Sequence, residues 1–170
     1  MTKISLKNIK FLILGISLSL FVSCNLFPCG WATDLDSVDE KPKADFLIGT
    51  YKLDERTLDF IPGYENAESA RLILKKDGSL EIKNTPIGTF DFMSYYDETD
   101  QNVNGTGTWK TEKGKYNAEL NVGVKFEKKY SELDFWTDWD IYKKNGKPVI
   151  FIIIGDPDSC AAARFIKIAE

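Results

Sequence analysis

Apolar and polar side chains alternate along most of the chain after residue 46. The alternation is clearest over residues 116–126, where every second position is apolar and the positions between are polar, charged or glycine. A period of two is that of a strand with one buried face and one solvated face. The predicted buried face of this strand carries Tyr116, Ala118, Leu120, Val122, Val124 and Phe126.

The β-rich runs are short and are separated by Asp-Gly, Lys-Gly, Asn-Gly and Asp-Pro turns. This spacing predicts an all-β, antiparallel barrel or sandwich. Two turns have hairpin chemistry that fixes a register. A three-residue loop ending at Gly78 pairs Leu74 with Leu80 and Leu72 with Ile82. A two-residue turn at Lys113-Gly114 pairs Thr111 with Tyr116 and Trp109 with Ala118.

A third hairpin turns at Asn145-Gly146, a type I′ pattern. Its predicted inner face carries Trp139, Ile141, Ile150, Ile152 and Ile154, and its outer face carries Trp136, Asp138, Asp140, Tyr142, Val149, Phe151 and Ile153. That outer face is too apolar for ordinary solvated surface. Either the chain itself covers it, through the preceding linker or a short helix near residues 55–68, or a partner protein binds at Trp136, Tyr142 and Phe151.

The first residues have the three-part layout of an export signal. Lys3, Lys7 and Lys10 precede an apolar run at residues 11–22. The alternative is an uncleaved transmembrane helix, but a helix of this length spans about 18 Å, whereas the hydrocarbon core is roughly 30 Å thick.

Leu20-Phe21-Val22-Ser23-Cys24 resembles the lipobox of bacterial lipoproteins, although leucine is usual where Phe21 stands. The resemblance implies removal of residues 1–23 and lipidation of Cys24 with diacylglycerol and an N-acyl chain such as palmitate. Several acyl chains would give stable anchoring. A plain secretory cleavage would leave Cys24 as a thiol. Asn25 is not the aspartate of inner-membrane retention, so the family rule favours an exported protein anchored in the outer membrane of the cell envelope.

Composition narrows the function classes. Residues 24–45 are expected to form the anchor and a polar linker, and residues 46–170 a single domain. Removal of the three lysines from a chain of net charge −4 leaves about −7, a poor match for nucleic acid. The chain has no histidine, which excludes His-based triads and most catalytic zinc sites. Outside the cytoplasm Cys29 and Cys160 could form a disulfide or remain two thiols.

The opening run at residues 46–53, the Gly-Thr-Gly-Thr-Trp-Lys segment at 105–110 and the closing strand at 164–168 resemble the lipocalin-like lipoproteins of Bacteroidetes-type bacteria. Lipocalins open with Gly-X-Trp, and Tyr51 replaces that tryptophan here. The resemblance implies an up-and-down barrel of about 8–10 strands. It also implies that Arg164 packs over Tyr51 as a cation–π contact.

A lipocalin-like barrel is expected to hold a small apolar ligand. Inner-face candidates are Trp109, Tyr116, Leu120, Phe126 and Trp139, which would equally fill a ligandless core. In that alternative the protein is an envelope interaction module, such as an inhibitor, an immunity factor or an assembly subunit, and works through its outer strand face.

Neither an enzyme, a metal site nor a cofactor is expected. Residues 100–105 match the first half of an EF-hand loop, but Thr111 stands where the bidentate acid belongs. Asp156 and Asp158 could form a carboxylate pair of a hydrolase, and Asp-Pro is also a common turn. The turn is the favoured interpretation.

Overall fold

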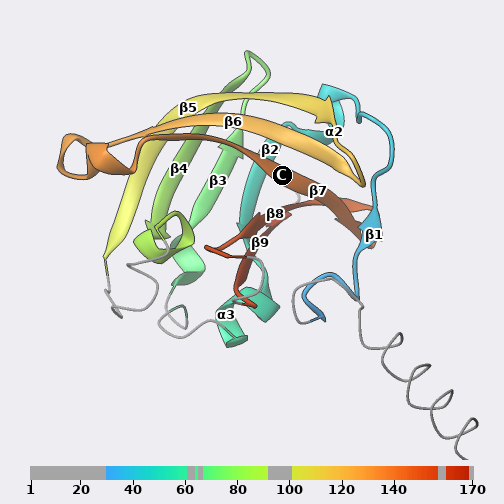
Figure 1. Ribbon diagram of the computed structural model, residues 1–170, viewed down its shortest axis with the longest axis horizontal. Helices are drawn as coiled ribbons and strands as arrows, with labels where there is room; N and C mark the ends of the chain where they lie inside the picture. The colour runs from blue at the N-terminus through green and yellow to red at the C-terminus, as the bar shows by residue number, and fades with distance from the viewer. Residues whose placement is uncertain (1–29, 61–63, 65–66, 92–100, 157–159, 169–170) are drawn as a thin grey trace, which may run out of the picture.

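The computed structural model describes residues 30–60, 64, 67–91, 101–156 and 160–168. Their main element is a closed antiparallel β-barrel (Figure 1). Eight strands follow one another around it, and the last returns to pair with the first. The predicted all-β, lipocalin-like up-and-down barrel is therefore confirmed. The strands are β2 (Gly49–Leu53), β3 (Arg71–Leu74), β4 (Ser79–Pro86), β5 (Asn102–Lys113), β6 (Ala118–Phe126), β7 (Phe135–Lys144), β8 (Lys147–Ile153) and β9 (Ala162–Lys167).

Two of the three predicted hairpins have the predicted register. In β3–β4, Leu74 lies opposite Leu80 and Leu72 opposite Ile82, and the backbone of the turn glycine has a φ of 79°. In β7–β8 the turn residues have φ angles of 52° and 76°, as a type I′ turn requires. Its pairs include Ile141 with Ile150, Tyr142 with Val149 and Asp140 with Phe151.

The predicted two-residue turn between β5 and β6 is wrong. Lys113 pairs with Ala118, so Tyr116 lies in a four-residue connection and its side chain is 78% exposed. The reason is a long-range contact. The side chain of Asn117 accepts a hydrogen bond from Val38 N at 2.6 Å, and Ala118 N donates to Val38 O at 2.6 Å. The slip moves the register by four residues, an even number, so the other residues of β6 keep their predicted faces.

The barrel is packed along its middle. The inner-face side chains of Leu120, Val122, Ile141 and Ile150 have no solvent-accessible surface. A side chain beside an internal cavity large enough for a ligand would keep some accessible surface. Among the described residues, the centre of the barrel is thus filled by its own side chains, as in other small barrels.

The segment before the barrel covers the outer face of β8 and β9. Residues 30–45, expected as a polar linker, bury Trp31 and Val38 against the barrel. The segment contains β1 (Asp36–Ser37), which pairs with the end of β7, and the start of α2 (Ala44–Leu47). Helix α3 (Glu55–Phe60) and β9 also pack together. Tyr142 and Phe151 are buried, so the prediction that the chain itself covers this apolar face is confirmed for these two residues.

The buried guanidinium of Arg164 holds the N-terminal segment against the barrel. Arg164 is 0% exposed, donates to both carboxylate oxygens of Asp34 at 2.7 and 3.0 Å, and forms an ion pair with Asp54 at 2.6 Å. Paired, bidentate geometry is what makes such a charge tolerable inside a protein. The hydrogen bonds from Arg164 hold the pKa of Asp34 well below its usual range.

The expected contact of Arg164 with Tyr51 is wrong. Phe165 faces the barrel interior, so its chain neighbour Arg164 faces outward, because side chains alternate along a strand. Tyr51 lies on the inner face opposite Lys167, and its hydroxyl donates to Leu47 O at 2.5 Å. Burial of this ring raises the pKa of Tyr51.

Candidate functional site

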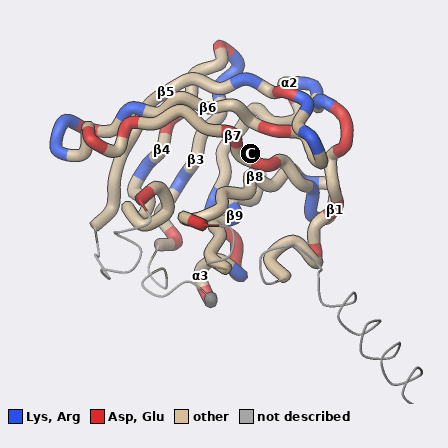
Figure 2. The backbone as a smooth tube through the Cα atoms, viewed as in Figure 1, with Lys and Arg blue, Asp and Glu red and all other residues tan. Residues whose placement is uncertain are grey.

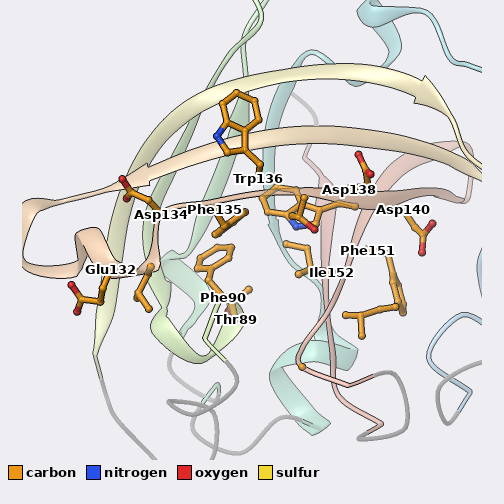
Figure 3. Close-up of a pocket in the computed structure, with 15 residues that line it drawn as sticks. Thr89, Phe90, Glu132, Asp134, Phe135, Trp136, Asp138, Asp140, Phe151 and Ile152 are labelled. Atoms are coloured by element: carbon orange, nitrogen blue, oxygen red, sulfur yellow. The ribbon is translucent and has the colours of Figure 1, made fainter.

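The barrel wall is split between β7 and β8. The two strands pair only from Lys144–Lys147 as far as Asp140–Phe151. Beyond that point β7 stays paired with β6, while β8 stays paired with β9. The divergence leaves a cleft of about 640 Å³, a volume typical of small-molecule sites. Its other walls come from the 3₁₀ helices η3 (Ile87–Thr89) and η4 (Lys128–Leu133) and from the residues next to them (Figure 3).

Aromatic rings form the inner wall of the cleft. Phe90, directly after η3, stacks against Phe135 with ring centroids 5.9 Å apart and against Trp139 at 6.3 Å. Phe135 and Trp139 are themselves 6.1 Å apart. Behind them Phe126 contacts Phe90 at 5.3 Å. Phe135 and Trp139 share the inner face of β7 because they are four residues apart in a strand. These rings pack together as an apolar cluster that lines the cleft at the barrel's edge.

Exposed apolar surface also gathers here. The described chain exposes three large apolar side chains, and two of them, Trp136 and Ile153, line the cleft. Trp136 is 75% exposed. Its indole lies over Gly123, where a Cβ atom would stand 2.6 Å from the ring. A tryptophan that is exposed together with a second apolar side chain at a cleft is a frequent mark of a binding surface.

Carboxylates line the rim. Glu132, Asp134, Asp138 and Asp140 all border the cleft. Asp134 accepts a hydrogen bond from the backbone N–H of Phe126 at 2.8 Å. Burial, with a smaller contribution from the negative charge of Glu119 on β6, raises the pKa of Asp140 to about 6. A perturbed carboxyl in a cleft is a frequent mark of a functional site.

The structure separates the five predicted ligand residues. Trp139 lines the cleft, and Phe126 supports it through Phe90. Trp109 is on the inner face near the β3–β4 hairpin, where its Nε1 donates to Lys75 O at 3.1 Å. Leu120 lies in the packed middle, and Tyr116 is outside the barrel, which corrects its predicted inner position.

The predicted partner-binding residues are also divided, since Trp136 is exposed whereas Tyr142 and Phe151 are buried by the chain itself. Sequence reasoning missed Phe90, Phe135 and Glu132. Phe135 shares the alternation of β7 and could have been found from it. Phe90 follows a segment without periodicity, so no pattern marked it.

Some of the remaining predicted residues lie outside the described ranges. Cys24 and Cys29 lie outside the described residues. Cys160 is disulfide-bonded, and its pairing with Cys29 stays a prediction. Asp158 is outside the description and Asp156 is exposed. In the segment that resembles an EF-hand loop, the side chain of Asn104 has a structural role. It accepts a hydrogen bond from the backbone N–H of Asn84 and donates one to the side chain of Glu127.

Within the described ranges no cluster of three or more His, Cys, Asp or Glu side chains is placed to bind a metal ion. No helix in the part of the chain that the structure describes has the length and apolarity to cross a membrane. The chain matches no protein-family model, no curated protein and no solved structure.

Proposed function

We propose that this protein is a binding protein of the bacterial cell envelope that holds a small ligand with an apolar body in the β7–β8 cleft. The observation that carries the proposal is the cleft itself, where the barrel wall opens onto the rings of Phe90, Phe135 and Trp139. A β-barrel of this type is compatible with such a role.

The proposed site is the cleft and not the barrel centre, because the central side chains leave no accessible surface. Covering about 200 Å² of apolar ligand surface at about 25 cal/mol per Å² contributes about 5 kcal/mol. That corresponds to a Kd of about 0.2 mM before polar contacts and the costs of association. Polar groups at the rim must supply the remaining affinity and the specificity.

Native mass spectrometry of the full chain, purified gently from its host, tests this function. We expect a reproducible small added mass that is lost in Phe135→Ala. The matched control is Phe46→Ala, because Phe46 is also a partly buried ring packed against the core and does not line the cleft. A small mass retained in Phe135→Ala, or no small mass in the wild type, would refute the proposal.

The proposed location rests on residues 1–24 and the lipobox-like sequence before Cys24. In this proposal the lipid on Cys24 anchors the protein in the outer membrane. Cys24→Ser should remove the lipid mass and move the protein from the membrane fraction to the soluble envelope fraction. A mature wild-type chain that carries no lipid mass would contradict the anchor and leave the binding function untouched.

A second function, capture of an envelope protein, is favoured by one observation. The Trp136 ring stands exposed on the outer face of β7, above a glycine. A protein-sized addition that disappears in Trp136→Ser and survives in Phe135→Ala would support this function. The reverse behaviour would leave the cleft as the working site.

A further inference from the structure

The cleft has an unusual balance of charge. Four of its lining residues are acidic, and none of the described residues that line it is lysine or arginine. Elsewhere the barrel surface mixes both signs (Figure 2). There some carboxylates are paired: Glu81 forms ion pairs with Lys75 and Lys83, and Glu112 with Lys110. No ion pair links any of the four carboxylates at the cleft to a described residue.

The acidic side chains and the rings are arranged in two layers. Phe90 and Phe135 face each other inside the cleft, whereas Asp138 and Asp140 extend from the other face of β7 (Figure 3). Alternation along β7 causes this separation, since odd-numbered positions face inward and even-numbered positions face outward. A ligand that enters between β7 and β8 therefore meets carboxylates at the rim and aromatic rings below them.

Two of these carboxylates can accept further hydrogen bonds. One oxygen of Asp138 accepts from Asn121 at 2.8 Å. One oxygen of Asp134 accepts from a backbone N–H. The second oxygen of each has no hydrogen-bond donor among the described residues. Lys110 lies within electrostatic range of Asp138, but its ion pair is with Glu112.

Aromatic rings beside carboxylates that have no ion-pair partner are the chemistry that recognises organic cations. The negative face of an aromatic ring attracts a cation, and quaternary ammonium groups are typically held in this way. The same carboxylates repel fatty acids and other anions. A neutral apolar molecule would gain from the rings and nothing from the rim.

We propose that the ligand of the β7–β8 cleft is an organic cation, a substituted ammonium group on an apolar body. Its charge lies at the acidic rim, which Glu132 and Asp138 border at opposite ends, and its apolar body lies against the rings that line the cleft (Figure 3). This inference rests on the proposed small-molecule function and narrows it to one ligand class.

The test compares choline with 3,3-dimethylbutan-1-ol, in which carbon replaces the charged nitrogen and the shape is kept. Both are titrated into the full chain in a non-ionic detergent, and the tryptophan indole N–H signals are followed by NMR. Trp139 and Trp136 report on the cleft, and Trp109 near the β3–β4 hairpin serves as an internal control. We expect choline to bind at least about tenfold more tightly than the alcohol, which corresponds to about 1.4 kcal/mol.

Two double variants distinguish an effect of the carboxylates at the cleft from an effect of the net charge of the protein. Glu132→Gln with Asp138→Asn removes two carboxylates from the rim, and we expect the preference for choline to disappear. Asp59→Asn with Glu68→Gln removes the same charge from exposed positions that do not line the cleft, and the preference should remain. Loss of the preference in both double variants would mean that only net charge matters, and would overturn the inference.

The remaining outcomes distinguish this inference from the function on which it rests. Equal binding of the two compounds, weakened by Phe135→Ala, would overturn the cation inference and leave an apolar site. A cleft that responds to a lysine-rich peptide and not to choline would assign the surface to a protein partner. If neither compound shifts the cleft signals, the cation inference fails. Native mass spectrometry of the host-purified protein then tests the proposed function separately. A bound small molecule without charge would support that function, and the absence of any small added mass would refute it.

Discussion

The carboxyl of Asp140 should make the protein less stable as pH rises, and Asp140→Asn should remove this effect. Asp140 lies where β7 and β8 begin to separate, opposite Glu119 on β6 and Phe151 on β8. Burial raises its pKa from 3.8 to about 6, with a smaller contribution from Glu119. The folded protein therefore binds this proton more tightly than the unfolded chain does.

Linkage fixes the sign of the effect. Between about pH 4 and pH 6 the folded state holds more protons at this site than the unfolded state, so the free energy of unfolding falls as pH rises. A difference of about 2 pKa units corresponds to about 3 kcal/mol. Because the side chain is only partly buried, solvent screening reduces this, and we expect about 1–2 kcal/mol. Asparagine has nearly the same shape and carries no charge.

Urea unfolding of wild type and Asp140→Asn, followed by tryptophan fluorescence from about pH 4 to about pH 8, measures the difference. Urea is preferred because guanidinium would screen the charges. We expect the variant to be more stable by about 1–2 kcal/mol above about pH 7 and to match the wild type near pH 4. Glu119→Gln, the control, should give a smaller gain. A difference that is constant across this range, or a less stable variant at high pH, would refute the reasoning.

Three other predictions concern the frame around the cleft. Arg164→Met should destabilise the protein by about 3–5 kcal/mol in urea, because the buried charge of Asp54 would keep only a long ion pair with Lys144, at 3.8 Å. Arg164→Met with Asp54→Asn should recover part of this loss, and no recovery would contradict the pairing. Gly107→Ala should cost far more than Gly146→Ala in thermal unfolding. A Cβ at Gly107 would lie 1.9 Å from a carbonyl oxygen, whereas Gly146 has open space and only its φ of 76° costs about 1 kcal/mol. The pKa of Asp34 is depressed in the folded state, so its carboxylate should stabilise the protein above about pH 4 and this stability should be lost as pH falls further. In an acid titration of the free energy of unfolding, Asp34→Asn should reduce that loss. An unchanged acid profile in the variant would contradict this role of Asp34.

The barrel was predictable where local chemistry decides the structure. Gly78 and the Asn145-Gly146 pair demand positive φ angles, and both turns set the register of their hairpins as expected. The Lys113-Gly114 turn failed because a distant residue decides it: Asn117 and Ala118 are held by hydrogen bonds to Val38. A sequence pattern covers near neighbours and contains no information on that contact.

The site was predictable only in part. Alternation along β7 placed Asp138 and Asp140 on one face with Trp136, and the structure keeps them there. The cleft itself depends on where β7 and β8 separate, which follows from the competing pairings of β6 and β9. Phe90 joins the rings through a tertiary contact. Strand pairings and ring contacts between residues that are distant in the sequence produce no local periodicity from which they could be predicted.

The extent of the N-terminal cover supports the assignment of the cleft. The chain buries Tyr142 and Phe151 on the outer face where β7 and β8 are paired. Past the last pair, Trp136 and Ile153 remain exposed. Among the described residues, the chain thus covers one apolar surface and leaves the neighbouring one exposed. Because exposed apolar surface carries a cost in solubility, its presence beside carboxylates without ion pairs is the reason for which we propose a ligand that covers it.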